Sequence, residues 1–469
     1  MTVATVGSEL GFSDLDEEVE AGELELEGEL PPWLGGSLLR TGPARWDLAE
    51  GSVRHWFDGL AMLHRFSFGD GRVTYANRFL RSRAFEAAQR DGRLGYREFA
   101  SDPCRSAFRR VSTLFDAAAQ LSDNGSVNVT RLGEQYLALT ETPLPVAFDP
   151  GTLETLGVRG KPPADISTAH PHHDRERREL VGHGTKIGAR SQYVLYAQRD
   201  VADQRIVARI PARRPAYQHS FGLTPRYAIV FEGPFVVNPL GLALADKPFI
   251  ENFTWEPERG TCFWVIDRER GGVVGPWTGE PLFCFHQVNA FEDGDDVVID
   301  LLAFDDASVV PALGLGRLRA GQTPPWPEMR RFRLPLSSPR AIRGEALSDV
   351  RFELPRIDYA RRNGREHRFV WGMASRDDGL FGGIVKVDVP TGEADAWHEP
   401  GSYPGEPVFV ARPDGEAEDD GVLLSVVLEP ERGQSSLLVL DARDLSERAS
   451  ARVPHHIPFG FHGQHFGSL

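Results

Sequence analysis

The chain has 469 residues, of which 41% are hydrophobic and 10% aromatic, and its formal net charge is -16 at pH 7. Such an acidic protein repels the phosphate backbone, which excludes non-specific nucleic-acid binding. The apolar content is sufficient for a large core, yet no apolar run approaches the roughly 20 residues of a membrane-spanning helix. The composition therefore predicts a soluble or peripheral protein.

The N-terminal segment and the cysteines both indicate the same cellular compartment. Residues 1–30 are acidic and lack the basic and apolar regions of a secretory signal, which favours a cytoplasmic protein. We expect residues 1–20 to form a flexible acidic leader. The three cysteines, Cys104, Cys262 and Cys284, have no CxxC spacing, which disfavours a disulfide framework, a zinc ribbon and an iron–sulfur cluster.

Short β-like runs separated by Gly, Asp and Asn fill most of the chain. The first is expected to begin at residues 37–40, after a turn. Many short strands are typical of a sandwich, barrel or propeller, and a propeller suits this length because it adds four-stranded blades without long exposed edges. No blade-length repeat is visible, so the pattern alone leaves the choice open. Further runs lie at residues 63–68, 136–140, 193–196, 227–231, 262–266, 297–302, 384–388 and 437–440.

Four histidines stand in similar apolar surroundings. Residues 457–466 are aromatic and glycine-punctuated, carry His462 and are expected to form a final strand, while His170, His219 and His286 lie in or beside β-like runs. A charged imidazolium is costly to bury there, whereas a neutral imidazole can bind a metal. The absence of HExxH and of cysteine ligands disfavours a zincin and a structural zinc site, but zinc, copper, iron and nickel all remain open.

Three glutamates occupy strand-like contexts in which a carboxylate is otherwise unfavourable: Glu141, Glu353 and Glu406. Metal-bound histidines normally donate their second ring N–H to a carboxylate or a carbonyl. We interpret the three glutamates as the outer partners of the histidines, the alternative being solvent-facing residues at strand ends.

A series of motifs in chain order resembles the carotenoid cleavage oxygenase family, and within it the animal-type branch of the β-carotene oxygenases and the retinal pigment epithelium retinoid isomerase. The resemblance runs through nearly the whole chain. The motifs lie at residues 36–43, 56–59, 128–130, 140–142, 169–172, 219–225, 289–293, 353–359, 406–410 and 461–463.

The resemblance implies an all-β fold, a seven-bladed propeller that forms one domain over residues 1–469, with a dome of loops and helices over an axial metal site. It also implies a non-haem Fe(II) held by His170, His219, His286 and His462, with Glu141, Glu353 and Glu406 behind the ligands and His170 lacking a glutamate. The residues expected near an apolar substrate tunnel are Phe57, Val127, Thr140, Tyr217 and Phe461, and ordinary core positions are the alternative for each.

The activity implied is cleavage of a conjugated double bond of a carotenoid or apocarotenoid with O2, giving aldehydes of the retinal type. A retinoid isomerohydrolase is the second hypothesis, and a non-catalytic carotenoid-binding propeller is the third. Stilbene- or phenylpropene-cleaving activity is disfavoured, because family members that cleave phenolic stilbenes carry a lysine where this chain has Thr140.

Two apolar segments resemble the membrane-contacting parts of the animal enzymes. Residues 103–121 contain Cys104, and their apolar side chains recur at helical spacing; residues 234–246 form the second segment. We expect peripheral membrane contact there, because a carotenoid is almost insoluble in water and requires an apolar mouth. A helix packed on the propeller, with Cys104 buried, is the alternative.

Overall fold

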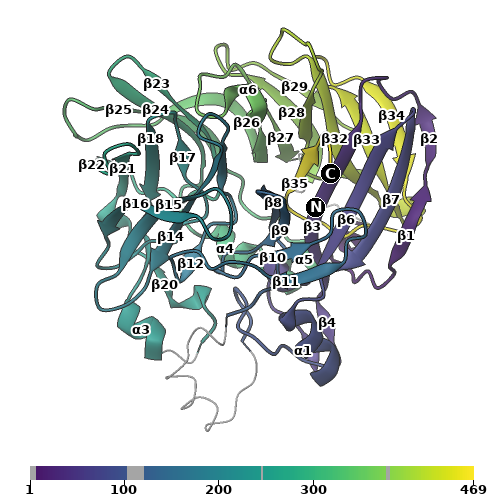
Figure 1. The fold of residues 1–469 in the computed structure, drawn as a ribbon, viewed down its shortest axis with the longest axis horizontal. Coiled ribbons are helices and arrows are strands. Elements are labelled where there is room, and N and C mark those ends of the chain that lie inside the picture. The colour runs from purple at the N-terminus through teal and green to yellow at the C-terminus, as the bar shows by residue number, and fades with distance from the viewer. Residues whose placement is uncertain (1–6, 103–120, 245–246, 376–380) are drawn as a thin grey trace.

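A computed structural model describes residues 7–102, 121–244, 247–375 and 381–469, and its strands surround a central axis (Figure 1). Most of the sheets have four to six strands, and one has seven. In the seven-stranded sheet, β26 (Glu345–Arg356) pairs with β25 (Glu328–Pro335) up to Arg351 and with β27 (Phe369–Ser375) from Phe352 onward, so this one strand serves two blades. When that sheet is counted as two blades and the two-stranded pairs are left aside, the described sheets form seven blades, which confirms the predicted propeller.

The blades follow one another along the chain. Blade 1 consists of β1 (Val19–Glu23), β7 (Arg72–Phe79), β6 (Leu60–Gly69), β3 (Gly36–Arg45) and β35 (Gly463–Phe466). Blade 2 consists of β11 (Thr155–Val158), β10 (Val146–Phe148), β9 (Gln135–Leu139) and β8 (Asn128–Leu132). Blade 3 consists of β12 (Ile166–Ser167), β13 (His172–Asp174), β14 (Glu179–Lys186), β15 (Gln192–Gln198) and β16 (Gln204–Pro211).

The remaining blades have the same plan. Blade 4 contains β17 (Gly222–Leu223), β18 (Tyr227–Glu232), β21 (Thr261–Asp267) and β22 (Val273–Gly279). Blade 5 contains β23 (Gln287–Asp293), β24 (Asp296–Ala303), β25 (Glu328–Pro335) and β26; blade 6 contains β26, β27 (Phe369–Ser375), β28 (Phe381–Asp388) and β29 (Ala394–Trp397). Blade 7 contains β30 (Tyr403–Pro404), β31 (Val408–Ala411), β32 (Gly421–Glu429), β33 (Gln434–Asp441), β34 (Glu447–Arg452) and β2 (Glu25–Gly28).

Both chain ends close the ring. The C-terminal strand β35 pairs with β3 in blade 1, where Arg40 faces Gly463, and the N-terminal strand β2 pairs with β34 in blade 7. Each end of the chain is therefore held by hydrogen bonds to the other. The expected final strand over residues 457–466 is shorter than predicted, because only β35 is extended and His462 lies just before it.

The flexible leader predicted for residues 1–20 is wrong from residue 7 onward. The 3-10 helix η1 (Ser8–Phe12) packs Phe12 fully inside the protein, with ring centroids 5.8 Å from Trp56 and 5.1 Å from Phe459. Burying one large aromatic side chain stabilises a fold by about 2 kcal/mol, which is sufficient to anchor a short acidic segment.

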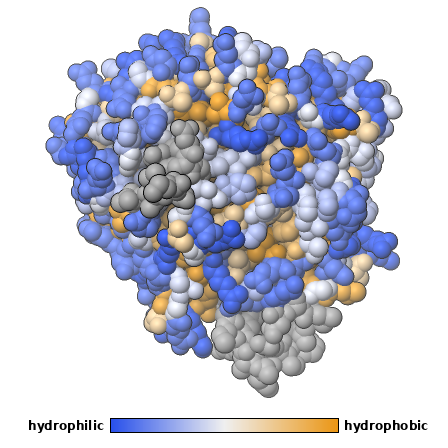
Figure 2. Space-filling model, turned by 180° about the vertical axis from the view of Figure 1, so that it is seen from behind, coloured by the Kyte–Doolittle hydropathy of each residue, from blue (hydrophilic) through white to orange (hydrophobic). Residues whose placement is uncertain are grey.

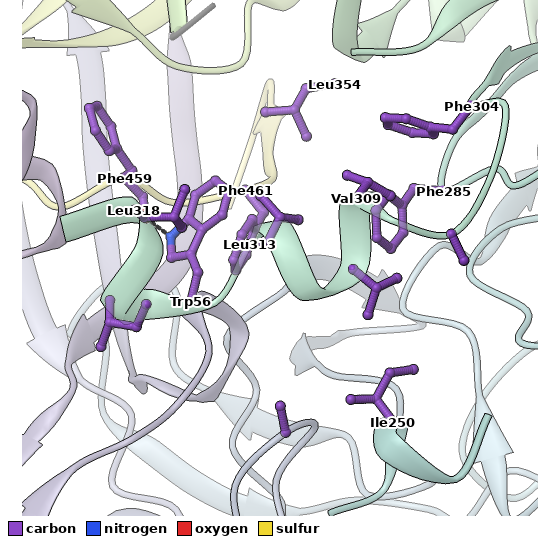
Figure 3. Close-up of a cluster of buried hydrophobic side chains, with 14 of the residues drawn as sticks. Trp56, Ile250, Phe285, Phe304, Val309, Leu313, Leu318, Leu354, Phe459 and Phe461 are labelled. Atoms are coloured by element: carbon purple, nitrogen blue, oxygen red, sulfur yellow. Dashed lines mark hydrogen bonds between the residues drawn. The ribbon is translucent and has the colours of Figure 1, made fainter. Parts of the chain in front are cut away.

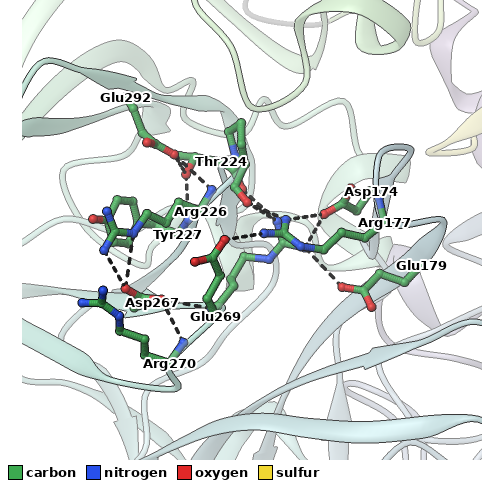
Figure 4. Close-up of polar contacts among 12 residues, drawn as sticks. Asp174, Arg177, Glu179, Thr224, Arg226, Tyr227, Asp267, Glu269, Arg270 and Glu292 are labelled. Atoms are coloured by element: carbon green, nitrogen blue, oxygen red, sulfur yellow. Dashed lines mark hydrogen bonds and ion pairs between the residues drawn. The ribbon is translucent and has the colours of Figure 1, made fainter.

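A buried charge network joins blades 3 and 4 (Figure 4). Arg268, which is only 7% exposed, donates to Asp174 at 2.5 Å and to the Thr224 carbonyl at 2.9 Å, and lies 3.4 Å from Glu179. Buried charges are tolerated when they are paired and hydrogen-bonded, so the network fixes the relative position of the two blades.

A dome of loops and short helices covers one side of the propeller and encloses an apolar cluster (Figure 3). Trp56 lies at its centre and donates its indole N–H to the Phe459 carbonyl at 2.8 Å. Residues of this cluster immediately precede or follow His286, Glu353 and His462, so the dome is continuous with the histidine region. The dome includes η2 (Trp56–Asp58), η4 (Ile250–Asn252), α4 (Val309–Ala312) and α5 (Leu315–Arg319).

The other elements are short. No helix within the described ranges is long and apolar enough to cross a membrane. Figure 2 shows apolar side chains gathered in a band on one face of an otherwise largely hydrophilic surface. The elements not yet named are α1 (Arg83–Asp91), α3 (Pro239–Leu244), α6 (Tyr359–Arg362), η5 (Pro257–Arg259), η6 (Pro430–Arg432), the pair β4 (Asp47–Leu48) and β5 (Gly51–Ser52), and the pair β19 (Phe235–Val237) and β20 (Phe253–Trp255).

Candidate metal centre

The four predicted histidines lie next to edge strands of four different blades. His170 lies between β12 and β13, His219 precedes β17, His286 immediately precedes β23, and His462 immediately precedes β35. The order of strands in the sheets places β12, β17, β23 and β35 at blade edges. Residues far apart in the sequence therefore meet near the axis, where the blades converge.

The three predicted glutamates come from the other three blades. Glu141 follows β9 in blade 2, Glu353 lies in the part of β26 that belongs to blade 6, and Glu406 lies between β30 and β31 in blade 7. Each of the seven blades thus contributes one residue to the centre. These seven residues are far apart in the sequence, and the closed ring of blades is what brings them together.

The ligand atoms of the four histidines all lie within 4.8 Å of one another. The Nε2 atoms of His170 and His219 are 2.9 Å apart, and those of His286 and His462 are 3.1 Å apart. Two nitrogens that each lie about 2.1 Å from one metal ion, at a right angle, are separated by about 3 Å. The distances therefore fit neighbouring ligands of a single ion.

Carboxylates fix three of the four imidazole rings. His219 Nδ1 lies 2.6 Å from Glu141, His286 Nδ1 lies 2.5 Å from Glu353, and His462 Nδ1 lies 2.7 Å from Glu406. A carboxylate only accepts, so each Nδ1 carries the proton and each Nε2 presents its lone pair to the centre.

His170 differs from the other three histidines. Within the described ranges it has no carboxylate partner, and its backbone N–H donates to Thr168 Oγ1 at 2.9 Å. The orientation of its ring therefore depends on the backbone and on the neighbouring imidazoles rather than on a glutamate.

Burial favours the neutral form of His170, His219 and His462. It lowers the pKa of His170 well below the ordinary value, with the neighbouring imidazoles acting in the same direction. Burial likewise lowers the pKa of His219, and it lowers that of His462 to about 4 although Glu406 opposes the shift. Neutral imidazoles at physiological pH have the free lone pairs that a metal ion requires.

Glu353 and Glu406 remain charged although their surroundings are largely apolar. Burial raises the pKa of Glu353, but His286, the Leu354 backbone N–H and His219 together outweigh it, and the pKa lies below its ordinary value. For Glu406, burial is outweighed by Arg356 and His462, and the pKa is again lowered. Negative charge behind the ligands offsets the positive charge of a bound metal ion.

The five residues expected near the tunnel fall into two places. Phe57, Tyr217 and Phe461 belong to the apolar dome cluster, in which the Phe57 and Phe461 rings are 5.0 Å apart. Val127 packs in a separate cluster between blades 2 and 3, and Thr140 lines a cavity between the same blades. The structure thus brings three of the five together in the dome and packs the side chains of the other two between blades 2 and 3, although the Val127 carbonyl accepts from the His462 backbone N–H at 3.3 Å.

Sequence reasoning assigned no role to three residues close to the centre, Phe285, Arg356 and Trp56, and only part of the role of a fourth, Tyr217. Tyr217, expected to line the tunnel, donates its hydroxyl to Glu141 at 2.8 Å, so it also holds a carboxylate. Phe285 lies beside His219, with ring centroids 5.2 Å apart, and its position directly before His286 was the available signal. Arg356 and Trp56 lie inside motifs that were noted, but without an assigned role.

The propeller brings together four histidines backed by three glutamates, a group of side chains that could hold a metal ion. A family model described as retinal pigment epithelial membrane protein matches residues 12–467, and the chain belongs to this family. The carotenoid-cleaving dioxygenase of Pongo abelii is 34% identical, over 93% of this chain and 90% of its own length. The carotenoid isomerooxygenase of Galleria mellonella is 35% identical, over 96% of this chain and 94% of its own length.

A solved structure and a further sequence relative support the same family. Cobalt-substituted apocarotenoid oxygenase from Synechocystis has a TM-score of 0.85 at 26% identity, covering 97% of this chain and 98% of its own. The mouse β,β-carotene 15,15'-dioxygenase is 31% identical, over 95% of this chain and 89% of its own length. The family predicted from the sequence motifs is confirmed.

Proposed function

We propose that this protein is an Fe(II)-dependent dioxygenase that cleaves a conjugated double bond of a carotenoid or apocarotenoid with O2 and releases aldehydes. The four-histidine centre beneath an apolar dome is the observation that carries the proposal. The relatives named as carotenoid-cleaving dioxygenases support it, because each is similar over most of both chains.

The donor set fits iron. His170, His219, His286 and His462 would hold the ion, since imidazole is a good ligand for iron and the set has no thiolate that would favour structural zinc. Iron bound there would supply the binding and activation of O2. The three glutamates hold the proton on Nδ1 of their histidines and so fix the ring orientations.

The dome would bind the polyene and exclude water. Phe285 and Phe461 immediately precede His286 and His462, so aromatic rings lie directly beside the ligands. A polyene has no group that forms strong hydrogen bonds, and it is held by dispersion against such rings. The position at which the apolar channel stops the substrate would then select the double bond that is cleaved.

Product analysis tests this function. Purified, iron-loaded protein incubated with a panel of carotenoids and apocarotenals should convert at least one of them into shorter aldehydes, detected by liquid chromatography. Fully iron-loaded protein that leaves the whole panel intact in the presence of O2 would contradict the proposal.

A retinoid isomerohydrolase is the second candidate, and the isomerooxygenase among the relatives is the observation that favours it. It would use the same residues with the metal as a Lewis acid, so the two functions differ in their need for O2 rather than in their site.

We also propose peripheral membrane contact near α3. The predicted segment 234–246 is only partly suitable, because Phe235–Val237 is the buried strand β19, whereas Leu240 is 71% exposed. Nearly all of the predicted segment 103–121, including Cys104, lies outside the described residues. Leu240 is therefore the side chain on which a test can be built.

Replacing Leu240 with Ser should weaken binding to liposomes several-fold, because it removes an exposed apolar side chain from the contact. Turnover of a short, soluble apocarotenal should remain unchanged. The matched control is Leu156→Ser in β11, where the leucine is 47% exposed. Equal liposome binding by the Leu240 variant, the control and the parent protein would refute contact at α3.

A further inference from the structure

The three glutamates behind the histidines differ in what else they contact. Glu141 accepts from the Tyr217 hydroxyl, a neutral donor. Glu353 accepts from the Leu354 backbone N–H at 2.7 Å, and its other oxygen, Oε1, is buried with no hydrogen-bond partner among the described residues. Glu406 alone of the three accepts from an arginine, Arg356, at 2.8 Å.

Arg356 lies where three blades meet. Its side chain is 14% exposed, and besides Glu406 it donates to the carbonyl oxygen of Gly463, the residue that follows His462. Glu406 also accepts from the Gly463 backbone N–H at 2.9 Å. One guanidinium therefore holds both the carboxylate behind His462 and the backbone next to it.

The contacts of Arg356 reach a second histidine. Its guanidinium lies 3.4 Å from the side-chain oxygen of Gln464, and the Gln464 amide lies 3.4 Å from Asn128. Asn128 donates to the carbonyl of Ala169 at 2.9 Å, directly before His170. Arg356 is thus connected to the segments that carry both His462 and His170.

The charge of Arg356 has a separate consequence. An arginine bonded to Glu406 opposes the negative charge behind His462, whereas among the described residues no arginine or lysine is bonded to Glu353 behind His286. Arg40 adds further positive charge nearby. Its guanidinium packs close to Gly405, the residue before Glu406, where a side-chain carbon would lie 3.6 Å from the nearest guanidinium nitrogen. Charges act strongly in a buried site, where water screens them little.

We propose that Arg356 is a positioning residue that orients His462 through Glu406 and, by cancelling the charge of Glu406, stabilises the metal in its divalent state. The inference rests on the proposed iron centre. Oxidation of Fe(II) removes one electron and adds one positive charge, which is less favourable beside a cation. Removal of Arg356 should therefore favour Fe(III), the form that does not start the proposed reaction.

The test is the reduction potential of the bound iron, measured by titration with one-electron mediators and followed by the spectrum of the metal. Arg356→Gln should shift the Fe(III)/Fe(II) equilibrium about tenfold toward Fe(III), which corresponds to about 59 mV for a one-electron couple. Arg356→Lys, which keeps the charge, should restore most of the potential of the parent protein.

A second variant tests the role of charge. Glu406→Gln removes the negative charge and leaves the arginine, so its potential should shift in the opposite direction, toward Fe(II). The double variant Arg356→Gln with Glu406→Gln should lie near the parent protein. The control is Arg331→Gln, because Arg331 is also bonded to a buried carboxylate, Asp300, at 2.8 Å and 2.7 Å, but not to a partner of a histidine ligand.

The outcomes separate this inference from the proposed function. Parent protein that binds no iron overturns the iron centre and the role of Arg356 with it. Iron-loaded parent and variants of equal potential overturn the role of Arg356 alone, as does a shift of the same size in Arg331→Gln. If Arg356→Gln does not fold, equal potentials in Arg356→Lys, Glu406→Gln and the parent protein overturn the inference.

Discussion

His286→Ala protein is expected to lose its metal while remaining folded. The substitution removes one of the four Nε2 atoms at the centre, the one that lies 3.1 Å from His462 Nε2, and leaves Glu353 without its imidazole partner. Iron content, measured by mass spectrometry of the metal, should fall from close to one ion per chain to a small fraction of that. Turnover should fall by more than about 100-fold, beyond the effect usual for the outer partners of metal ligands.

The matched control for this variant is His183→Ala. His183 is also buried, in β14, but it has no carboxylate partner within the described ranges. This control should retain iron, and circular dichroism should show that both variants are folded. Full iron occupancy in His286→Ala, or zinc in place of iron in the parent protein, would contradict the proposed centre.

Glu353→Gln should lower the iron affinity by about 10- to 100-fold. Glutamine keeps the shape of the side chain but removes the negative charge of the carboxylate, whose oxygen accepts a hydrogen bond from His286 at 2.5 Å. In the part of the chain that the structure describes, no arginine is bonded to Glu353, in contrast to Glu406, so the charge of Glu353 acts on the centre without an arginine that opposes it. The measurement is the iron dissociation constant, obtained by competition with a chelator.

Glu134→Gln is the control for Glu353→Gln, because the Glu134 side chain is 92% exposed and belongs to a surface ion pair. It should bind iron as the parent protein does. An unchanged dissociation constant in Glu353→Gln would show that the carboxylate orients nothing and offsets no charge.

The all-β class could be predicted from the sequence because the strands are short, apolar and separated by turn residues, whereas the choice of a seven-bladed propeller rested on the resemblance to the family. The closure of the ring and the shared strand β26 could not, since both depend on pairings between distant segments. Phe12 was assigned to a flexible leader because its neighbours are acidic, and its burial depends on Phe459 at the opposite end of the chain.

The site was predictable to a similar extent. The four histidines and three glutamates stand out because ionisable groups are rare in apolar strands. Arg356 did not, because an arginine after a proline at the end of a strand is usually solvated, and its partners Glu406 and Gly463 are 50 and 107 residues away in the sequence. The bond from the Tyr217 hydroxyl to Glu141 was likewise not predicted, since the resemblance placed this residue near the tunnel and gave its hydroxyl no role.

The source of the oxygen atoms in the product tests the central claim most directly. Iron-loaded protein is supplied with a carotenoid or apocarotenal substrate and 18O2, and the products are trapped rapidly to limit exchange of the carbonyl oxygens with water. A dioxygenase places label in both aldehydes and stops when O2 is withdrawn. Turnover that continues unchanged without O2, with products that carry oxygen from water, would contradict the dioxygenase and favour the isomerohydrolase.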